Sequence, residues 1–288
     1  MGPIGVNVVV QGVLAGLVYA LMGLGFTVIF RSMRVVNFAH GALTMLATVA
    51  AFLMFRTAGV DPLLAFILIA AVFFGLGYLS QRLLIHPFLR RPRHQQFLFL
   101  VGLAIVVTNG LVLIFGPGAH AVELSYGSGS YPVGPVALDK IRLSAGIAAL
   151  ACAAGVLAFL RFTRIGTAIR ACAENPLGAA VAGLDVERLY AVAFGIGLAC
   201  VGAAGALLMG IANAGPGLSS SYTLLTFAVV LIGGLGSLAG ALVGGVLVGI
   251  AEASAGIFIA PSMGSVFVVG LLIAVLVLRP QGLFGFRA

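Results

Sequence analysis

Long apolar runs constrain this chain more than any other feature of its sequence. A run of about 18 to 25 apolar residues crosses a hydrocarbon layer of about 30 Å as a helix. With 62% hydrophobic and only 8% charged residues, the chain has far less polar surface than a soluble protein needs. We predict an all-α polytopic membrane protein. Its expected spans lie near residues 6–30, 38–55, 62–85, 96–116, 143–162, 189–213, 238–258 and 264–279.

A further apolar stretch, residues 222–235, looks too short to span alone. The expected number of transmembrane helices is therefore about eight, or nine if this stretch also crosses. Directly after it, the run LIGGLGSLAG at 231–240 has glycines too dense for a rigid helix interior. We predict a broken or re-entrant segment there, buried by neighbouring helices. No linker separates soluble regions, so residues 1–288 are expected to form one membrane domain.

The net charge of +8 comes from basic residues in short breaks between spans, which does not favour nucleic-acid binding. The positive-inside rule makes these breaks cytoplasmic and places the N-terminus outside, with no cleavable signal expected. Residues 117–141 then form an external loop with a short surface helix at most. The C-terminus is cytoplasmic only if an odd number of crossings follows Gly215. The basic residues in these breaks are Arg31, Arg34, Arg82, Arg90, Arg91, Arg93, Arg161, Arg164, Arg170, Arg188, Arg279 and Arg287.

The sequence offers little for covalent chemistry. A phosphate-binding loop of the GxxxxGK[ST] kind needs its lysine, and the single lysine here, Lys140, stands in VALDKIR. Ser237 lacks the flanking glycines of a nucleophile elbow. We expect no enzyme, no cofactor and no ATP hydrolysis in this chain. No metal-ligand or disulfide spacing relates the histidines and cysteines, which are His40, His86, His94, His120, Cys152, Cys172 and Cys200.

Polar side chains follow one face of the second expected span. At about 100° per residue, four of them fall within an arc of roughly 80°. A polar stripe in a membrane helix faces the protein interior or a water-filled path. Two interpretations stay open, a lining for the translocation path or a set of interhelical hydrogen bonds with a helix cap. The four residues are Asn37, His40, Thr44 and Thr48.

The C-terminal third carries two further features. Glycines four residues apart form two stripes that let another helix approach closely, and packing within the chain is favoured over a subunit interface. They are Gly236, Gly240 and Gly244 in one stripe, with Gly245 and Gly249 in the other. Glu252 is a carboxylate inside an apolar run, so it is either a proton carrier or a partner for a basic group. Its place near the end of a span favours a structural role.

The cytoplasmic loop 161–188 is the long charged segment between apolar blocks. Within it, Asn175 and Pro176 predict a helix start and Gly183 predicts its end, so a helix of about two turns is expected. A short capped helix in a cytoplasmic loop is suited to docking a soluble partner, and the alternative is a helix that lies on the inner leaflet. Arg170 and Glu174 precede this helix.

The order ENPLGAAVAGLD at 174–185 resembles the cytoplasmic coupling loop of ABC importer permeases. The wider match is similar to the LivH-type permeases of branched-chain amino acid importers, over nearly the whole chain and in the same order. One difference is Ala42, where an acidic residue is common in that family. The matching blocks are NFAHGALTMLA at 37–47, IGTAIRACAENPLGAAVAGLDVERLYAVAFGIG at 165–197, LIGGLGSLAGALVGGVLVGIAEA at 231–253 and LRPQGLFG at 278–285.

This resemblance implies a bacterial inner-membrane importer with a second related permease, two cytoplasmic ATPases and an external substrate-binding protein. It implies alternating access driven by ATP, with the external loop helping to receive the binding protein. The coupling-loop residues that it implies are Glu174, Ala179, Ala180 and Gly183.

The solute stays open between branched-chain or other hydrophobic amino acids and urea or short amides. A stand-alone secondary transporter or channel with Glu252 as its proton site, or a purely structural membrane subunit, are the competing classes.

Overall fold

The computed structural model describes residues 3–89, 93–116, 118, 129–133, 136–212, 215–258 and 263–285. Helices make up most of this length. They are α1 (Pro3–Met33), α2 (His40–Ala58), α3 (Pro62–Ser80), α4 (His86–Leu89), α5 (Arg93–Phe115), α6 (Lys140–Phe162), α7 (Arg164–Glu174), α8 (Pro176–Val181), α9 (Val186–Ile211), α10 (Ser219–Gly233), α11 (Leu238–Phe258) and α12 (Gly264–Leu278). A π-helical turn, Gln81–Ile85, joins α3 to α4, and a 3-10 turn, Pro216–Leu218, precedes α10.

Seven helices in the described ranges are long and apolar enough to cross a membrane. Each corresponds to an expected span, which confirms the predicted fold class. The remaining expected span is α12, which has only 15 residues and a length of about 22 Å. The seven segments are Gly5–Met33, His40–Ala58, Pro62–Phe88, His94–Phe115, Lys140–Phe162, Val186–Ile211 and Leu238–Ile257.

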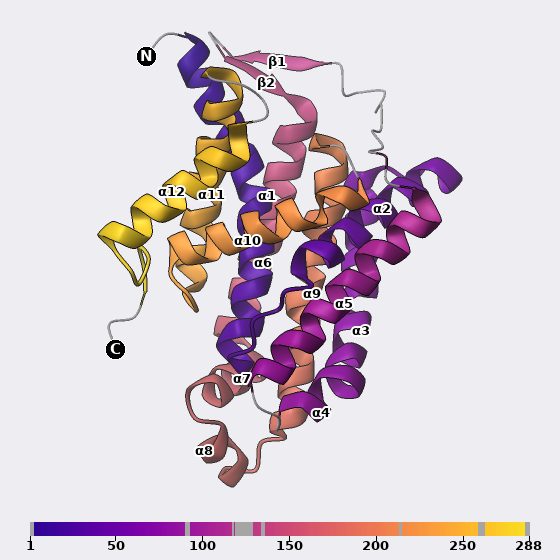
Figure 1. The fold of residues 1–288 in the computed structure, drawn as a ribbon, viewed down its shortest axis with the longest axis vertical. Coiled ribbons are helices and arrows are strands. Elements are labelled where there is room, and N and C mark those ends of the chain that lie inside the picture. The colour runs from indigo at the N-terminus through magenta and orange to yellow at the C-terminus, as the bar shows by residue number, and fades with distance from the viewer. Residues whose placement is uncertain are drawn as a thin grey trace.

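The two most buried of these helices, α1 and α9, run through the centre of the molecule (Figure 1). The N-terminus and a β-hairpin lie at one end, and α7 and α8 lie at the other. Small residues allow the central helices to pack closely. A Cβ added to Gly202 of α9 would stand 2.8 Å from Cβ of Phe73 on α3, and Gly25 of α1 approaches the backbone of α9 in the same way.

The predicted break in the glycine-rich segment is confirmed. Between α10 and α11, Gly234 and Gly236 have φ values of 103° and 84°, a region that favours glycine. The carbonyls of Ile232 and Gly233 at the end of α10 accept hydrogen bonds of 2.9 Å from the backbone N–H groups of Leu283 and Phe284. The C-terminal segment therefore covers the broken backbone and satisfies carbonyls that a helix end leaves free.

Helix α10, which contains most of the apolar stretch 222–235, lies across the middle of the molecule at a steep angle to α1 and α6 (Figure 1). The helices α10, α11 and α12 all follow Gly215 in the chain. Of these three, only α11 is long enough to cross a membrane by itself, since α10 and α12 have 15 residues each. The cytoplasmic position of the C-terminus therefore stays a prediction.

The predicted external loop differs from expectation in its described part. Strands β1 (Ser130–Val133) and β2 (Val136–Asp139) form an antiparallel hairpin, which the sequence did not predict, and the described part of this loop contains no helix before α6. Gln11 of α1 donates from Nε2 to the carbonyl of Ala137 at 2.9 Å, which ties the hairpin to the bundle. Residues 119–128, with Glu123 and His120, lie outside the described residues, as do Arg90, Arg91 and Arg287.

Candidate functional site

The loop between α6 and α9 folds as two short helices at one end of the molecule (Figure 1). Asn175 caps α8, because its Oδ1 accepts a hydrogen bond from the N–H of Gly178 at 2.9 Å, and Pro176 occupies the first turn. Gly183 ends the helix with φ of 82°, and the N–H of Leu184 donates to the carbonyl of Ala179 at 3.0 Å. The predicted start, end and length of this helix are confirmed.

The surface of α8 is exposed and apolar. Leu177 and Val181 are 78% and 84% exposed, and Ala180 is exposed between them. Ala179 is buried against the rest of the chain and holds α8 in place. An exposed apolar helix on a charged loop is a surface that a protein partner can cover. Ala179 therefore positions α8, whereas Leu177, Ala180 and Val181 are exposed for contact with a partner.

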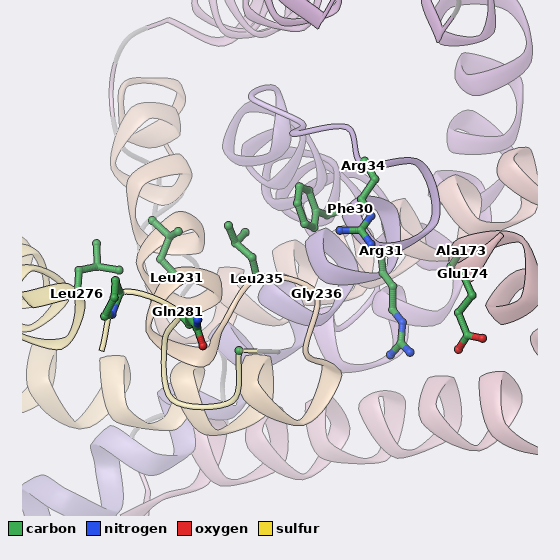
Figure 2. A pocket seen from close by; sticks show the side chains of 12 residues that line it. Phe30, Arg31, Arg34, Ala173, Glu174, Leu231, Leu235, Gly236, Leu276 and Gln281 are labelled. Carbon is green, nitrogen blue, oxygen red and sulfur yellow. The ribbon is translucent and has the colours of Figure 1, made fainter. Parts of the chain in front are cut away.

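Arg170 and Glu174, which precede α8, contact the end of α6 and a cavity rather than the apolar surface of α8. Arg170 donates from Nη2 to the carbonyl of Arg161 at 3.4 Å and to Oγ1 of Thr167 at 3.3 Å, which fixes α7 against the end of α6. Glu174 ends α7 and lines a cavity of about 560 Å³, which we name the coupling cavity. Figure 2 shows that the side chains of Arg31 and Glu174 point to the same side of it.

The coupling cavity joins segments that are distant in sequence. Its walls come from the end of α1, the end of α7, the glycine break and the C-terminal segment (Figure 2). Both Arg31 and Arg34 contribute positive charge, and Glu174 contributes negative charge. A movement of α7 would therefore change the surroundings of the end of α1 directly. The walls include Arg31, Arg34, Ala173, Glu174, Leu235 and Gly236.

The polar stripe on α2 is packed inside the bundle. All four side chains, of Asn37, His40, Thr44 and Thr48, are no more than 1% exposed, and none lines a cavity described here. Oγ1 of Thr44 and of Thr48 each donates to the carbonyl four residues earlier, at 2.9 Å. Nε2 of His40 bonds the carbonyl of Met22 at 3.0 Å, and Oδ1 of Asn37 accepts from the N–H of Ala39. This geometry favours the cap and hydrogen-bond interpretation over a path lining.

We expect the double substitution Thr44→Val and Thr48→Val to keep uptake within about twofold of the wild type. Valine has nearly the shape of threonine, and each lost hydroxyl bond lies within one helix, where its net contribution is about 1 kcal/mol. Uptake of labelled solute and expression of the variant are measured together. A specific loss of uptake at normal expression would show that the hydroxyls serve transport.

Two helices begin inside the membrane-spanning body rather than at its ends. Since His40 bonds Met22, α2 starts beside a residue that lies 11 positions before the end of α1 at Met33, about 16 Å along the helix. The first turns of α10 meet α2 there, because a Cβ on Gly41 would collide with Ser219 and Thr223. Residues 34–37 between α1 and α2 are not helical.

A cavity of about 440 Å³, the outer cavity, lies beside these two helix starts. The start of α10 supplies hydroxyl groups, α5 supplies a threonine and an asparagine, and apolar side chains complete the wall. Two helix N-termini also bring partial positive charge to this region. Its lining residues are Phe38, Ala42, Val101, Ala104, Ile105, Thr108, Asn109, Ser219, Ser220, Thr223, Leu224 and Phe227.

A second cavity, the inner cavity, of about 490 Å³, follows the first along α5 toward the N-terminal end of that helix. On α5 it is lined by Gln96, Phe97 and Leu100, whereas the outer cavity begins at Val101. The two cavities therefore lie one after the other along a single helix. Phe38 is the residue that lines both of them.

Sequence reasoning missed the residues of both cavities. The run SSSYT at 219–223 was a usable signal, since several hydroxyl residues precede an apolar stretch that cannot span alone. Phe38 gave no such signal, because one phenylalanine in an apolar chain is ordinary. That Phe38 lines both cavities becomes visible only from where α2 and α10 start in space.

Glu252 lies between helices and faces both a hydrogen-bond partner and a small cavity. Its carboxylate bonds the Tyr19 hydroxyl of α1, with Arg142 nearby. A Cβ on Gly264 would stand 3.1 Å from Cγ of Glu252, so this side chain lies beneath the start of α12, where a carboxylate is favourable. These contacts suit the structural interpretation. Among the described residues, no group of three His, Cys, Asp or Glu side chains gathers as metal ligands.

The glycine stripes on α11 pack within the chain. Gly240 and Gly244 approach the backbone at Gly233, and Gly249 approaches the backbone of Gly12 and Gly16 on α1. Gly245 contacts Ala20 of α1 in the same way. The packing prediction for Gly236 is wrong, because no heavy atom lies within 4 Å of a Cβ placed there and its φ of 84° marks a turn.

Comparison with known proteins gives a consistent result. Residues 8–276 match the family described as "Branched-chain amino acid transport system / permease component". The chain is 30% identical to the high-affinity branched-chain amino acid transport system permease protein LivH of Escherichia coli (strain K12), over 96% of this chain and 94% of that protein. It is 29% identical to the corresponding permease BraD of Pseudomonas aeruginosa, with the same coverage.

A more distant relative is the probable branched-chain amino acid transport permease protein LivH of Methanocaldococcus jannaschii. It is 27% identical over 92% of this chain and 88% of that protein. No solved structure matches the chain at a significant level.

Proposed function

Because this multi-pass chain belongs to the family of branched-chain amino acid transport system permease components, we propose that it carries branched-chain or other hydrophobic amino acids inward across the bacterial inner membrane. It does so as one permease of an ATP-driven importer. The partners are a second related permease, two cytoplasmic ATPases and an external substrate-binding protein. The chain itself holds no cofactor, and ATP is bound by the partner subunits.

The observation that carries this proposal is α8, a capped helix whose apolar side chains are exposed. Leu177, Ala180 and Val181 face away from the chain. A groove on an ATPase that covers them would bury apolar surface worth roughly 25 cal/mol per Å². Since Ala179 is buried and α8 packs against α7 and α9, force applied to α8 reaches the bundle.

The outer and inner cavities are the proposed path for the solute. An amino acid with an aliphatic side chain needs apolar walls and a few polar contacts. The starts of α2 and α10 bring the partial positive charge of two helix N-termini toward a carboxylate, as broken membrane helices do in other transporters. The second permease would close the open side of this path along α5, whose side chains at Leu98, Ile105 and Val106 are exposed.

The solute is tested by deleting the gene and measuring uptake of labelled leucine, isoleucine, valine, urea and acetamide. We expect uptake of the branched-chain amino acids to fall to background and to return when the gene is restored. Uptake of urea and acetamide should stay unchanged. Loss of urea or amide uptake alone would place the chain with the amide importers, and unchanged uptake of every solute would leave only a structural role.

A further inference from the structure

We propose that Phe38 is the gate of this permease, and that residues 34–39 carry the movement of the coupling loop to it. This inference rests on the proposed function, because a gate has meaning only on a path for solute. Phe38 closes the path, and residues 34–39 open it.

Phe38 lies where the outer and the inner cavity meet. Its side chain lines both the outer and the inner cavity. Its ring stands 4.7 Å from that of Phe97 on α5 at an interplanar angle of 84°, and 5.0 Å from that of Phe227 on α10. Three rings from three separate segments therefore meet between two cavities. A solute that passes from one cavity to the other must displace Phe38.

The backbone that carries Phe38 is the second argument. Residues 34–39 lie outside α1 and α2, whereas Phe97 and Phe227 belong to helices. Arg34 has φ of 56°, and it is the non-glycine residue with positive φ in the described part of the chain. A left-handed conformation is unfavourable for arginine, and such residues cluster where a segment switches. Phe38 is thus the member of the trio best able to move.

Arg34 connects the segment that carries Phe38 to the coupling loop. Arg34 lines the inner cavity together with Phe38, and it also lines the coupling cavity together with Ala173 and Glu174 (Figure 2). Glu174 stands directly before the cap of α8. When an ATPase moves α8, the wall beside Arg34 moves as well. A change in the backbone conformation of Arg34 rotates the residues that follow it, and this rotation withdraws the Phe38 ring from the rings of Phe97 and Phe227.

The test uses the complete importer in liposomes that are loaded with labelled leucine. In the wild type, leucine should be retained without ATP. The Phe38→Ala variant should release it at least about tenfold faster, because both ring contacts are lost, and its ATPase activity should no longer drive accumulation. Phe38→Leu should restore part of the retention. The matched control is Phe267→Ala on α12, an exposed phenylalanine that lines neither the inner nor the outer cavity and should retain leucine.

A second measurement keeps all three rings. Cysteines replace Val36 and Gln96, which both line the inner cavity, in a chain whose native cysteines are alanine, and a short, cleavable thiol cross-linker joins the segment before Phe38 to α5. Uptake should fall to background and recover on cleavage. Retention by Phe38→Ala equal to the wild type, or uptake that survives the cross-link, would overturn the gate. Absence of ATP-driven uptake in the wild type would instead defeat the proposed function.

Discussion

Substitution of Ala180 by aspartate is expected to reduce ATP-driven uptake at least about a hundredfold while the permease stays in the membrane. Ala180 is exposed on α8 and has the flanking apolar residues Leu177 and Val181 beside it. A carboxylate at this position cannot enter an apolar groove without losing its hydration, which costs several kcal/mol when no partner is supplied. Each 1.4 kcal/mol is a factor of ten in binding. Uptake and co-purification of the ATPase subunits are measured on the same preparations.

The matched control for this change is Ala58→Asp, the same substitution at an exposed position at the C-terminal end of α2, away from α8. It should leave the ATPase subunits bound. The variant Ala179→Asp serves a different purpose, because Ala179 is buried and its change should unseat α8 itself. If Ala180→Asp retains both the ATPase subunits and coupled ATPase activity, α8 is not the docking element.

Substitution of Gly41 by valine should prevent correct assembly of the permease. A Cβ on Gly41 would collide with the backbone of Ser219 and Thr223, so α10 has to move away from α2. Overpacking of this kind costs about 1 to 3 kcal/mol, and backbone on the opposing side leaves little room for relaxation. We expect a melting temperature lower by on the order of 5 °C, together with loss of uptake, measured by fluorescence-detected thermal unfolding in detergent.

Gly102→Val provides the control for this second prediction. Gly102 is also in a membrane helix, but no heavy atom lies within 4 Å of a Cβ placed there. The two substitutions therefore share the cost of helix propensity and differ only in the collision. Equal melting temperatures for the two variants would contradict the close contact between α2 and α10.

The sequence predicted best those features that depend on local patterns. The apolar runs gave the seven long helices, and the order Asn175, Pro176 and Gly183 gave α8 with its caps. The dense glycines at 231–240 gave the break between α10 and α11. Each of these signals acts over a few turns of helix, so it can be recognised without knowing what lies next to it.

The features that sequence reasoning missed depend on neighbours. His40 and Thr44 have the spacing expected of a helix face that lines a path. A helix face that is buried against α1 and α9 has the same spacing, so the sequence cannot distinguish the two. Gly236 shares the spacing of its stripe but lies in the turn, because the helix starts only at Leu238. The place of Phe38 between two cavities arises from where α2, α5 and α10 meet in space.

The measurement that tests the central claim most directly compares two energy sources in liposomes that contain the purified complex. Labelled leucine and its binding protein are added outside, and either ATP is enclosed or a proton gradient is imposed without ATP. We predict accumulation with ATP alone, and none with ATP in the Ala180→Asp variant. Accumulation driven by the proton gradient in the absence of the ATPase subunits would contradict the account and identify a stand-alone secondary transporter.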